Sequence, residues 1–157
     1  MIFNKLKNNK QQGFTLIELL VVIGILAVLL AITLIAINPA KQFKAANDTK
    51  RRSDVSAILN AIDQYAADNQ GALPAGIPVA PTAAGTVSHA GVDICALLVT
   101  KYLAALPVDP LTNNGTPVTD CTSATYNTNY TVVQTSDSRV TVSAPAAEGG
   151  SPISVTR

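Results

Sequence analysis

An apolar run of twenty-four residues, from Phe14 to Ile37, constrains the fold of this chain more than any other feature. The run reads FTLIELLVVIGILAVLLAITLIAI and holds one ionisable side chain, Glu18. A helix of this length is about 36 Å long, which exceeds the ~30 Å hydrocarbon core of a bilayer. The run therefore predicts a transmembrane helix, or a helix whose surroundings are equally apolar.

The residues before this run differ from an ordinary secretory signal. Residues 1–13 carry Lys5, Lys7 and Lys10 and no acid, and Gly13 lies directly against the apolar run. A secretory signal has its cleavage site beyond a shorter apolar stretch, so cleavage discards that stretch. A cut after Gly13 would instead keep the apolar helix in the mature protein.

Charge and composition argue against nucleic-acid binding and catalysis. Residues 1–13 hold three of the eleven basic side chains, which leaves eight against ten acidic ones in the remainder. A mildly acidic remainder has no general electrostatic reason to bind nucleic acid. His89, the only histidine, lies in a polar stretch and has no partners for a zinc site or a nucleophilic triad. We therefore expect no enzyme activity, catalytic residue, metal ligand or cofactor.

A second helical pattern follows Asn38-Pro39. Proline disfavours helix in the preceding residue and suits the first helical position, so this pair indicates either a kink or a new helix start. The apolar residues beyond it recur every three or four positions: Val55, Ile58, Leu59, Ile62, Tyr65 and Ala66. Asn69-Gln70-Gly71 predicts the helix end. Residues 38–70 are therefore expected to form an amphipathic helix on which a soluble domain packs.

This stretch also contains the basic triplet Lys50-Arg51-Arg52. The preferred interpretation is a solvated helix face, with the basic charges balanced by Asp48 and Asp54. Lipid head groups, DNA or acidic groups on adjacent subunits are the alternative partners.

The remaining residues, 71–157, are expected to form a globular head. Their first part is rich in Gly, Pro, Ala and Thr and is predicted as a loop, which leads into a short helix capped by Asp93. Thr/Val-rich runs at 130–135 and 139–143 predict two antiparallel strands joined by a tight turn. Further edge strands are expected at 117–119 and 153–156. The fold class is thus α+β, with a long N-terminal helix packed on a small antiparallel sheet.

Two cysteines, Cys95 and Cys121, follow the apolar run. In an oxidising compartment the simplest interpretation is one disulfide, which would close a loop of about 27 residues and contribute about 3–4 kcal/mol in the chain-entropy model. Two reduced, buried thiols are the alternative. The spacing is unlike a CxxC motif, so neither interpretation suggests catalysis.

The residues Gly13 to Ile23, GFTLIELLVVI, resemble the N-terminal signature of type IV pilins and type II secretion pseudopilins. The resemblance implies that a membrane-embedded prepilin peptidase cuts on the cytoplasmic side, between Gly13 and Phe14, and methylates the new N-terminal Phe14. The expected divisions are a leader peptide (1–13), a transmembrane and filament-core helix (14–37), an amphipathic second half of the helix (38–70) and the globular head (71–157).

Glu18 would be the fifth residue of the mature chain. A carboxylate inside a bilayer is costly and usually has a partner. Cleavage creates one, because the α-amine of Phe14 on a neighbouring subunit stays cationic when methylated and would lie at a similar depth. Glu18 is therefore expected to align subunits during assembly.

Oxygen-rich side chains also gather near the expected start of the sheet, at Asp109, Asn113, Asn114 and Asp120. Similar loops in type II secretion major pseudopilins hold calcium, so the resemblance implies calcium binding as one interpretation of these residues. Asp and Asn also stabilise turns by bonding to their own backbone, and this interpretation is preferred here. No metal site is predicted.

Together these features predict a structural subunit, the major one, of a type IV pilus or related pseudopilus. The subunit would polymerise with itself through its N-terminal helix, with prepilin peptidase and the pilus or secretion assembly machinery as partners. Before assembly it would be a single-pass cytoplasmic membrane protein with the leader inside and the head outside, and afterwards part of an extracellular fibre. The alternative is a signal-anchored extracytoplasmic binding or adhesion domain that keeps residues 1–13 and does not polymerise.

Overall fold

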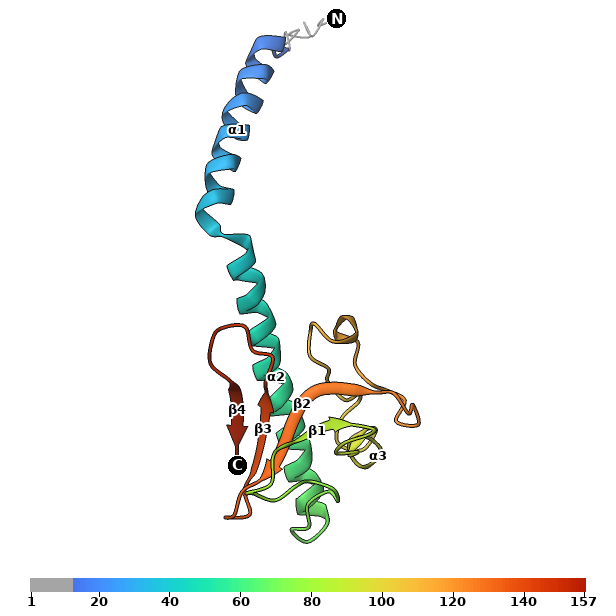
Figure 1. Cartoon of the computed structure of the whole chain (residues 1–157). Helices are drawn as coiled ribbons and strands as arrows, with labels where there is room; N and C mark the ends of the chain where they lie inside the picture. The colour runs from blue at the N-terminus through green and yellow to red at the C-terminus, as the bar shows by residue number, and fades with distance from the viewer. Residues whose placement is uncertain (1–12) are drawn as a thin grey trace, which may run out of the picture. The chain divides into compact units, whose positions relative to one another are not determined.

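The computed structural model describes residues 13–157. The chain divides into two compact units, one ending at Pro39 and the other running from Ala40 to Arg157. The described residues form a long apolar helix, a second long helix and a four-stranded antiparallel sheet (Figure 1). The α+β fold predicted from the sequence is confirmed.

Helix α1 spans Leu16–Ile37 and ends where the backbone of Asn38 enters the left-handed region with φ of 47°. Asparagine tolerates this conformation better than most residues. Pro39 then begins helix α2, Pro39–Asp68, at a position where its missing N–H has no helical partner to lose. The Asn38-Pro39 pair therefore separates two helices, which is the second of the two interpretations that the sequence allowed.

Helix α2 buries the predicted apolar stripe against the head. Val55, Ile58, Leu59 and Ile62 are completely buried. The helix ends where Gln70 and Gly71 adopt positive φ angles of 56° and 89°, a conformation that closes many helix C-termini. The predicted helix end is therefore confirmed.

The sheet has the order β1-β2-β3-β4, and every neighbouring pair is antiparallel. Its strands are β1 (Gly85–Ser88), β2 (Asn127–Gln134), β3 (Val140–Ala144) and β4 (Ile153–Thr156). Side chains of β3 alternate between buried and half-buried, so one face of the sheet lies on the core. The predicted hairpin at 130–143 and the edge strand at 153–156 are confirmed.

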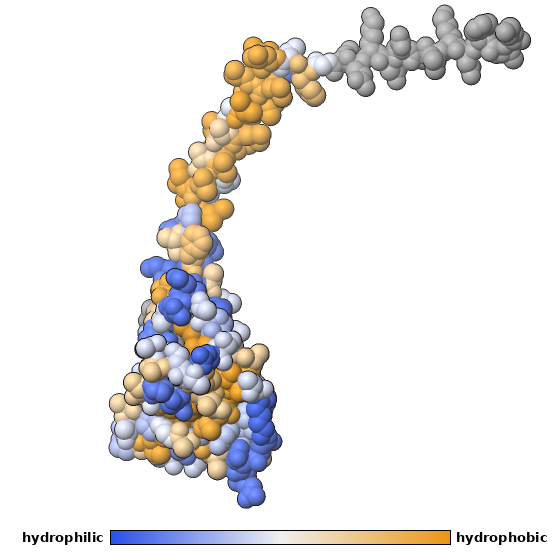
Figure 2. All heavy atoms as spheres, turned by 90° about the vertical axis from the view of Figure 1, so that its right-hand side faces the viewer, coloured by the Kyte–Doolittle hydropathy of each residue, from blue (hydrophilic) through white to orange (hydrophobic). Residues whose placement is uncertain are grey.

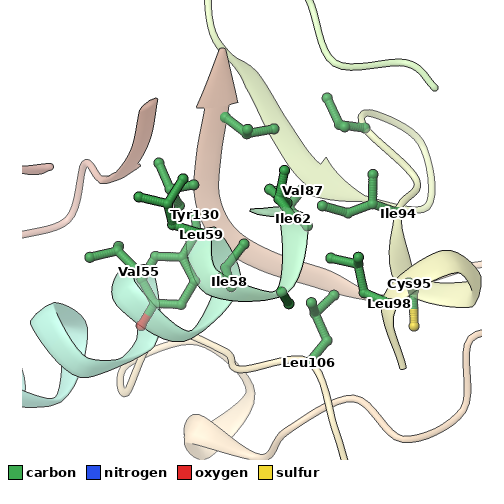
Figure 3. Close-up of a cluster of buried hydrophobic side chains, with 14 of the residues drawn as sticks. Val55, Ile58, Leu59, Ile62, Val87, Ile94, Cys95, Leu98, Leu106 and Tyr130 are labelled. Carbon is green, nitrogen blue, oxygen red and sulfur yellow. The ribbon is translucent and has the colours of Figure 1, made fainter. Parts of the chain in front are cut away.

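One hydrophobic core joins α2, the sheet and the loops of the head. Figure 3 shows Tyr130 of β2 beside the side chains of α2, with Val87 of β1 close to Ile62. The connecting segments complete the core with Ile94, Cys95, Leu98 and Leu106. Each aliphatic side chain of this size contributes about 1.5–3 kcal/mol when fully buried.

Two predictions about strands in the head are wrong. Strand β1 lies in the Gly/Pro-rich stretch that was expected to be a loop, and its residues pair with β2. Residues 117–119 form no strand, since in this part of the described chain Val118 makes only an isolated bridge to Leu106. In neither segment does the local sequence pattern distinguish a strand from a loop. Pairing with distant residues determines which of the two forms.

The short helix also differs in detail from its prediction. Helix α3, Cys95–Leu98, follows Ile94 and receives no side-chain cap. The Asp93 carboxylate instead accepts a hydrogen bond from the Tyr126 hydroxyl. Leu97, which was expected on the buried side, is 36% exposed.

Candidate functional site

The predicted cleavage junction lies at the first described residues. Gly13 and Phe14 precede the helix without regular structure, and Phe14 is 83% exposed. A Cβ atom added at Gly13 would meet nothing within 4 Å. Residues 1–12 of the predicted leader lie outside the described part of the chain. Packing among the described residues therefore gives no reason for glycine at position 13.

A capping box starts α1 immediately after this junction. The Thr15 hydroxyl accepts a bond from the Glu18 backbone N–H at 3.3 Å. In return, Glu18 Oε2 accepts bonds from the Thr15 backbone N–H at 2.8 Å and from its hydroxyl at 2.7 Å. Such a reciprocal pair satisfies N–H groups that a helix start would otherwise leave unbonded. The T-x-x-E spacing was readable in the sequence, but the prediction for Glu18 did not use it.

The face of α1 that Figure 2 shows is largely apolar, and Glu18 is the one ionisable side chain of this helix. No residue of the described chain buries any of its side chains. The hydroxyl of Thr33 donates to the Leu30 carbonyl at 2.8 Å, so this polar group is satisfied inside the helix. Between residues 13 and 157, α1 is the one helix long and apolar enough to cross a membrane. An apolar surface this large needs a bilayer or other subunits to cover it.

Lys50 and Arg52 of the triplet 50–52 are exposed, as a solvated face predicts, and the expected pairing with Asp48 and Asp54 is present. Arg51, in contrast, is completely buried, so the solvated interpretation is wrong for this residue. Its Nε and Nη2 donate to the two carboxylate oxygens of Asp109 at 2.7 and 3.1 Å. Its Nη1 donates to Asp48 at 2.9 Å and to Glu148 at 3.2 Å. We call these four residues the Arg51 cluster. The cluster joins α2 to the segment after α3 and to the loop between β3 and β4.

Hydrogen bonds favour the charged forms of Asp48, Glu148 and Arg51. The Glu148 backbone N–H donates to Asp48 at 2.9 Å and, together with Arg51, lowers the pKa of Asp48. The Asn47 amide donates to Glu148 at 2.8 Å and likewise lowers its pKa, with a further contribution from Arg51. Hydrogen bonds to Asp109 raise the pKa of Arg51. The three carboxylates therefore share one permanently charged guanidinium.

A second buried polar contact lies one turn further along α2. Asp54, expected on the polar face, is only 5% exposed. It accepts a bond from the Tyr130 hydroxyl at 2.8 Å and pairs with Lys50 at 2.7 Å. Burial raises the pKa of Tyr130, and the bond to Asp54 adds to this shift. These contacts connect the helix to the middle of β2.

Cys95 and Cys121 form the expected disulfide, with 5.4 Å between their Cα atoms. This distance lies in the usual range of about 4.4–6.8 Å for disulfides. The bond ties α3 to the loop that precedes β2, where few backbone pairs hold the chain.

The remaining candidates are occupied by contacts within the head. His89 Nδ1 lies 3.2 Å from Oδ2 of Asp93. Asp109 belongs to the Arg51 cluster, and Asp120 accepts bonds from Thr122. Asn113 begins the 3₁₀ turn η1, Asn113–Gly115. Over residues 13–157, no group of three His, Cys, Asp or Glu side chains is arranged to hold a metal ion. The structure thus uses this polar stretch for turns and ion pairs.

The described chain has an apolar N-terminal helix with one carboxylate in its first turn, followed by a helix packed on an antiparallel sheet. The family model described as the prokaryotic N-terminal methylation motif matches residues 8–34. These observations confirm the resemblance to type IV pilins and type II secretion pseudopilins that the GFTLIELLVVI signature carries.

Two relatives come from type II secretion systems. The type II secretion system core protein G of Escherichia coli (strain K12) is 43% identical over 61 residues, which are 39% of this chain and 41% of that protein. The protein of the same name from Aeromonas hydrophila is 39% identical over 64 residues, 41% of this chain and 43% of that protein. The matches thus span less than half the length of either relative. No solved structure gives a significant match to the chain.

Proposed function

We propose that this protein is the major structural subunit of a pseudopilus or related type IV pilus, and not an enzyme. The observation that carries the proposal is the α1 surface, because 22 residues of apolar helix lie uncovered by the described chain. In a monomer such a surface needs a bilayer, and in a fibre the helices of neighbouring subunits can cover one another. The names of the two relatives favour a type II secretion pseudopilus over a surface pilus.

The subunit would begin as a single-pass protein of the cytoplasmic membrane with its head outside. Prepilin peptidase would then cut between Gly13 and Phe14 and methylate Phe14. The exposed, non-helical backbone at this junction supports access by a protease. The assembly machinery would finally move α1 from the membrane into the core of a helical polymer.

Intact-mass measurement on protein from the native host tests this processing. The expected mass corresponds to a chain that begins at a methylated Phe14. A chain that keeps residues 1–13 would refute the proposal and favour the membrane-anchored domain. Electron microscopy of sheared fibres, with mass spectrometry of their main component, tests polymerisation and the major-subunit role.

A bulky residue at position 13 should block processing without changing the fold, because an added Cβ meets no described atom within 4 Å and the residue lies before the helix. Gly24, which also has nothing within 4 Å of its added Cβ, offers a control. Gly24→Ala should be processed normally. Equal processing of both variants would contradict a specific cut after Gly13.

In the fibre, Glu18 would pair with the α-amine of Phe14 on a neighbouring subunit. A lone charge buried in the bundle costs several kcal/mol after relaxation, and the penalty recurs at each added subunit. Loss of the pair should therefore leave processed protein in the membrane with few or no fibres.

The capping box makes a sharper test possible than replacement of Glu18 alone. Glu18→Gln loses the charge but keeps an oxygen that can cap the helix, since glutamine also suits this position. Thr15→Ala removes the hydroxyl contacts but keeps the carboxylate. Charge pairing predicts that Glu18→Gln abolishes fibres whereas Thr15→Ala still forms them. The reverse result would show that helix capping, and not pairing with a neighbour's amine, is the role of Glu18.

A further inference from the structure

The first two turns of α2 make no contact that buries them in the head. Every residue from Pro39 to Ala46 is exposed, and the first buried residue of the helix is Asp48. Phe43 lies within this segment and is 71% exposed. Nothing in the described chain covers this ring, so it is free to be buried by a surface outside the chain.

The charge of the same segment is entirely positive. Residues 39–46 read PAKQFKAA, with two lysines and no acid. Lys41, Lys44 and Arg52 also line one open hollow of about 600 Å³ beside the loop at Glu148. Its two carboxylates, Asp48 and Glu148, both accept bonds from Arg51. Lys44 also interacts electrostatically with Glu148. Phe43 is not among the residues that line this hollow, so the lysines and the ring share the exposed segment 39–46 but not the hollow.

Chain connectivity limits where this segment can lie. Lys41 is four residues beyond Ile37, the last residue of α1, so the two Cα atoms are at most about 15 Å apart. If α1 spans the bilayer, as the proposed function requires, the lysines and Phe43 must lie close to the lipid head groups. Lysine amines attract anionic lipids, and aromatic rings favour the boundary between head groups and acyl chains.

We propose that residues 39–46 form an interfacial anchor that binds the phosphates of anionic phospholipids before assembly. Lys41 and Lys44 contact the phosphates, and Phe43 inserts its ring beside the upper acyl chains. The anchor fixes the depth of α1 in the membrane and adds to the work of extracting the subunit. This inference depends on the membrane-spanning role of α1 in the proposed function.

A single tryptophan tests the position of residue 43, because the chain contains no tryptophan of its own. The full chain carrying Phe43→Trp is reconstituted in vesicles whose acyl chains bear bromine near the head groups. The matched control is Leu111→Trp in the head, where Leu111 is 65% exposed. We expect at least about a two-fold loss of Phe43→Trp fluorescence and little change for Leu111→Trp. Equal quenching of the two would overturn the anchor.

Amine acylation tests the lysines in vesicles of phosphatidylcholine, alone or mixed with phosphatidylglycerol. We expect Lys41 and Lys44 to react roughly five-fold more slowly in the mixed vesicles, which matches the ~1 kcal/mol that an anionic surface gives each cation. Added salt should reverse the effect. Lys101 is the internal control, because it pairs with Asp68 at the opposite end of α2, about 36 Å from Lys44 along the helix.

Flotation of the same samples separates the two proposals. A chain that fails to float with either vesicle overturns both the membrane-spanning role and the anchor. Flotation without protection of Lys41 and Lys44 overturns the anchor alone. If protection of Lys41 and Lys44 increases with the protein-to-lipid ratio and does not depend on the anionic lipid, a neighbouring subunit covers residues 39–46. That result would also overturn the anchor.

Discussion

Replacing Arg51 by methionine removes the guanidinium of the Arg51 cluster while keeping most of its apolar stem. Asp109, whose side chain is completely buried, would lose both bonds from Arg51. Asp48 and Glu148 would lose their shared cation. The variant therefore leaves carboxylates close together in the head without an opposite charge.

The expected loss is large in comparison with the stability of a small domain. Breaking a buried ion pair by removing one partner costs about 3–5 kcal/mol, whereas whole domains are stable by about 5–15 kcal/mol. With a urea dependence of about 1–3 kcal/mol per molar, the unfolding midpoint should fall by roughly 2 M. Arg52→Met is the matched control, since Arg52 is exposed and should change stability by less than about 0.5 kcal/mol.

Near-ultraviolet circular dichroism can follow this unfolding in detergent, with the disulfide intact. The four tyrosines all lie between residues 65 and 130, so their signal reports the head and not α1. A free energy of unfolding of Arg51→Met within about 0.5 kcal/mol of that of Arg52→Met would refute the reasoning. It would mean that the cluster is no more stabilising than a solvated ion pair. The double variant Arg51→Met, Asp109→Leu should recover part of the loss, because both charges are then absent.

Three further predictions concern the same head. Asp48 and Glu148 have pKa values lowered from 3.8 and 4.5 by their bonds, so their contribution is present at neutral pH and should disappear as the pH falls below these values, as urea unfolding at several pH values would show. Arg51→Met should weaken this acid dependence. Tyr130→Phe should cost about 1.5–3 kcal/mol by thermal or urea unfolding, because it removes a buried bond to a charged group. Reduction of Cys95–Cys121 should cost about 3–4 kcal/mol and leave the helicity of α1 unchanged; equal stability of the reduced and oxidised head would contradict this.

Local sequence patterns predicted the elements whose signal is complete within a few residues. The apolar run predicted α1, and the three-to-four spacing from Val55 to Ile62 predicted the buried face of α2. Thr/Val alternation predicted the β2–β3 hairpin. Each pattern reflects a period of the backbone itself, so no distant residue was needed to interpret it.

Apart from the local pair of Arg51 with Asp48, the Arg51 cluster could not be predicted in this way. Arg51 is 58 residues from Asp109 and 97 from Glu148, and nothing near these acids marks them as partners. A charged triplet on a helix is usually solvated. Only the packing of α2 on the head brings these groups together, and burial then makes the pairing obligatory. Strand β1 escaped prediction for the same reason, since its pairing with β2 outweighs its weak local pattern.

The capping that Glu18 provides for its own helix is compatible, in the geometry of the carboxylate, with the proposed pairing with a neighbour's amine. Both bonds from Thr15 end on Oε2. Among the described residues, none of the hydrogen bonds to Glu18 ends on Oε1. A carboxylate has about four sites for accepted bonds, so an incoming amine can bind Oε1 while the capping box stays intact. Capping would then hold the carboxylate in one rotamer within the bilayer, at lower cost than an unbonded charge. Assembly would need no rearrangement of the subunit already in place.

Thr15→Ala should therefore loosen this rotamer, so that fibres still grow but grow more slowly. A complete loss of fibres would show that capping and pairing cannot be separated.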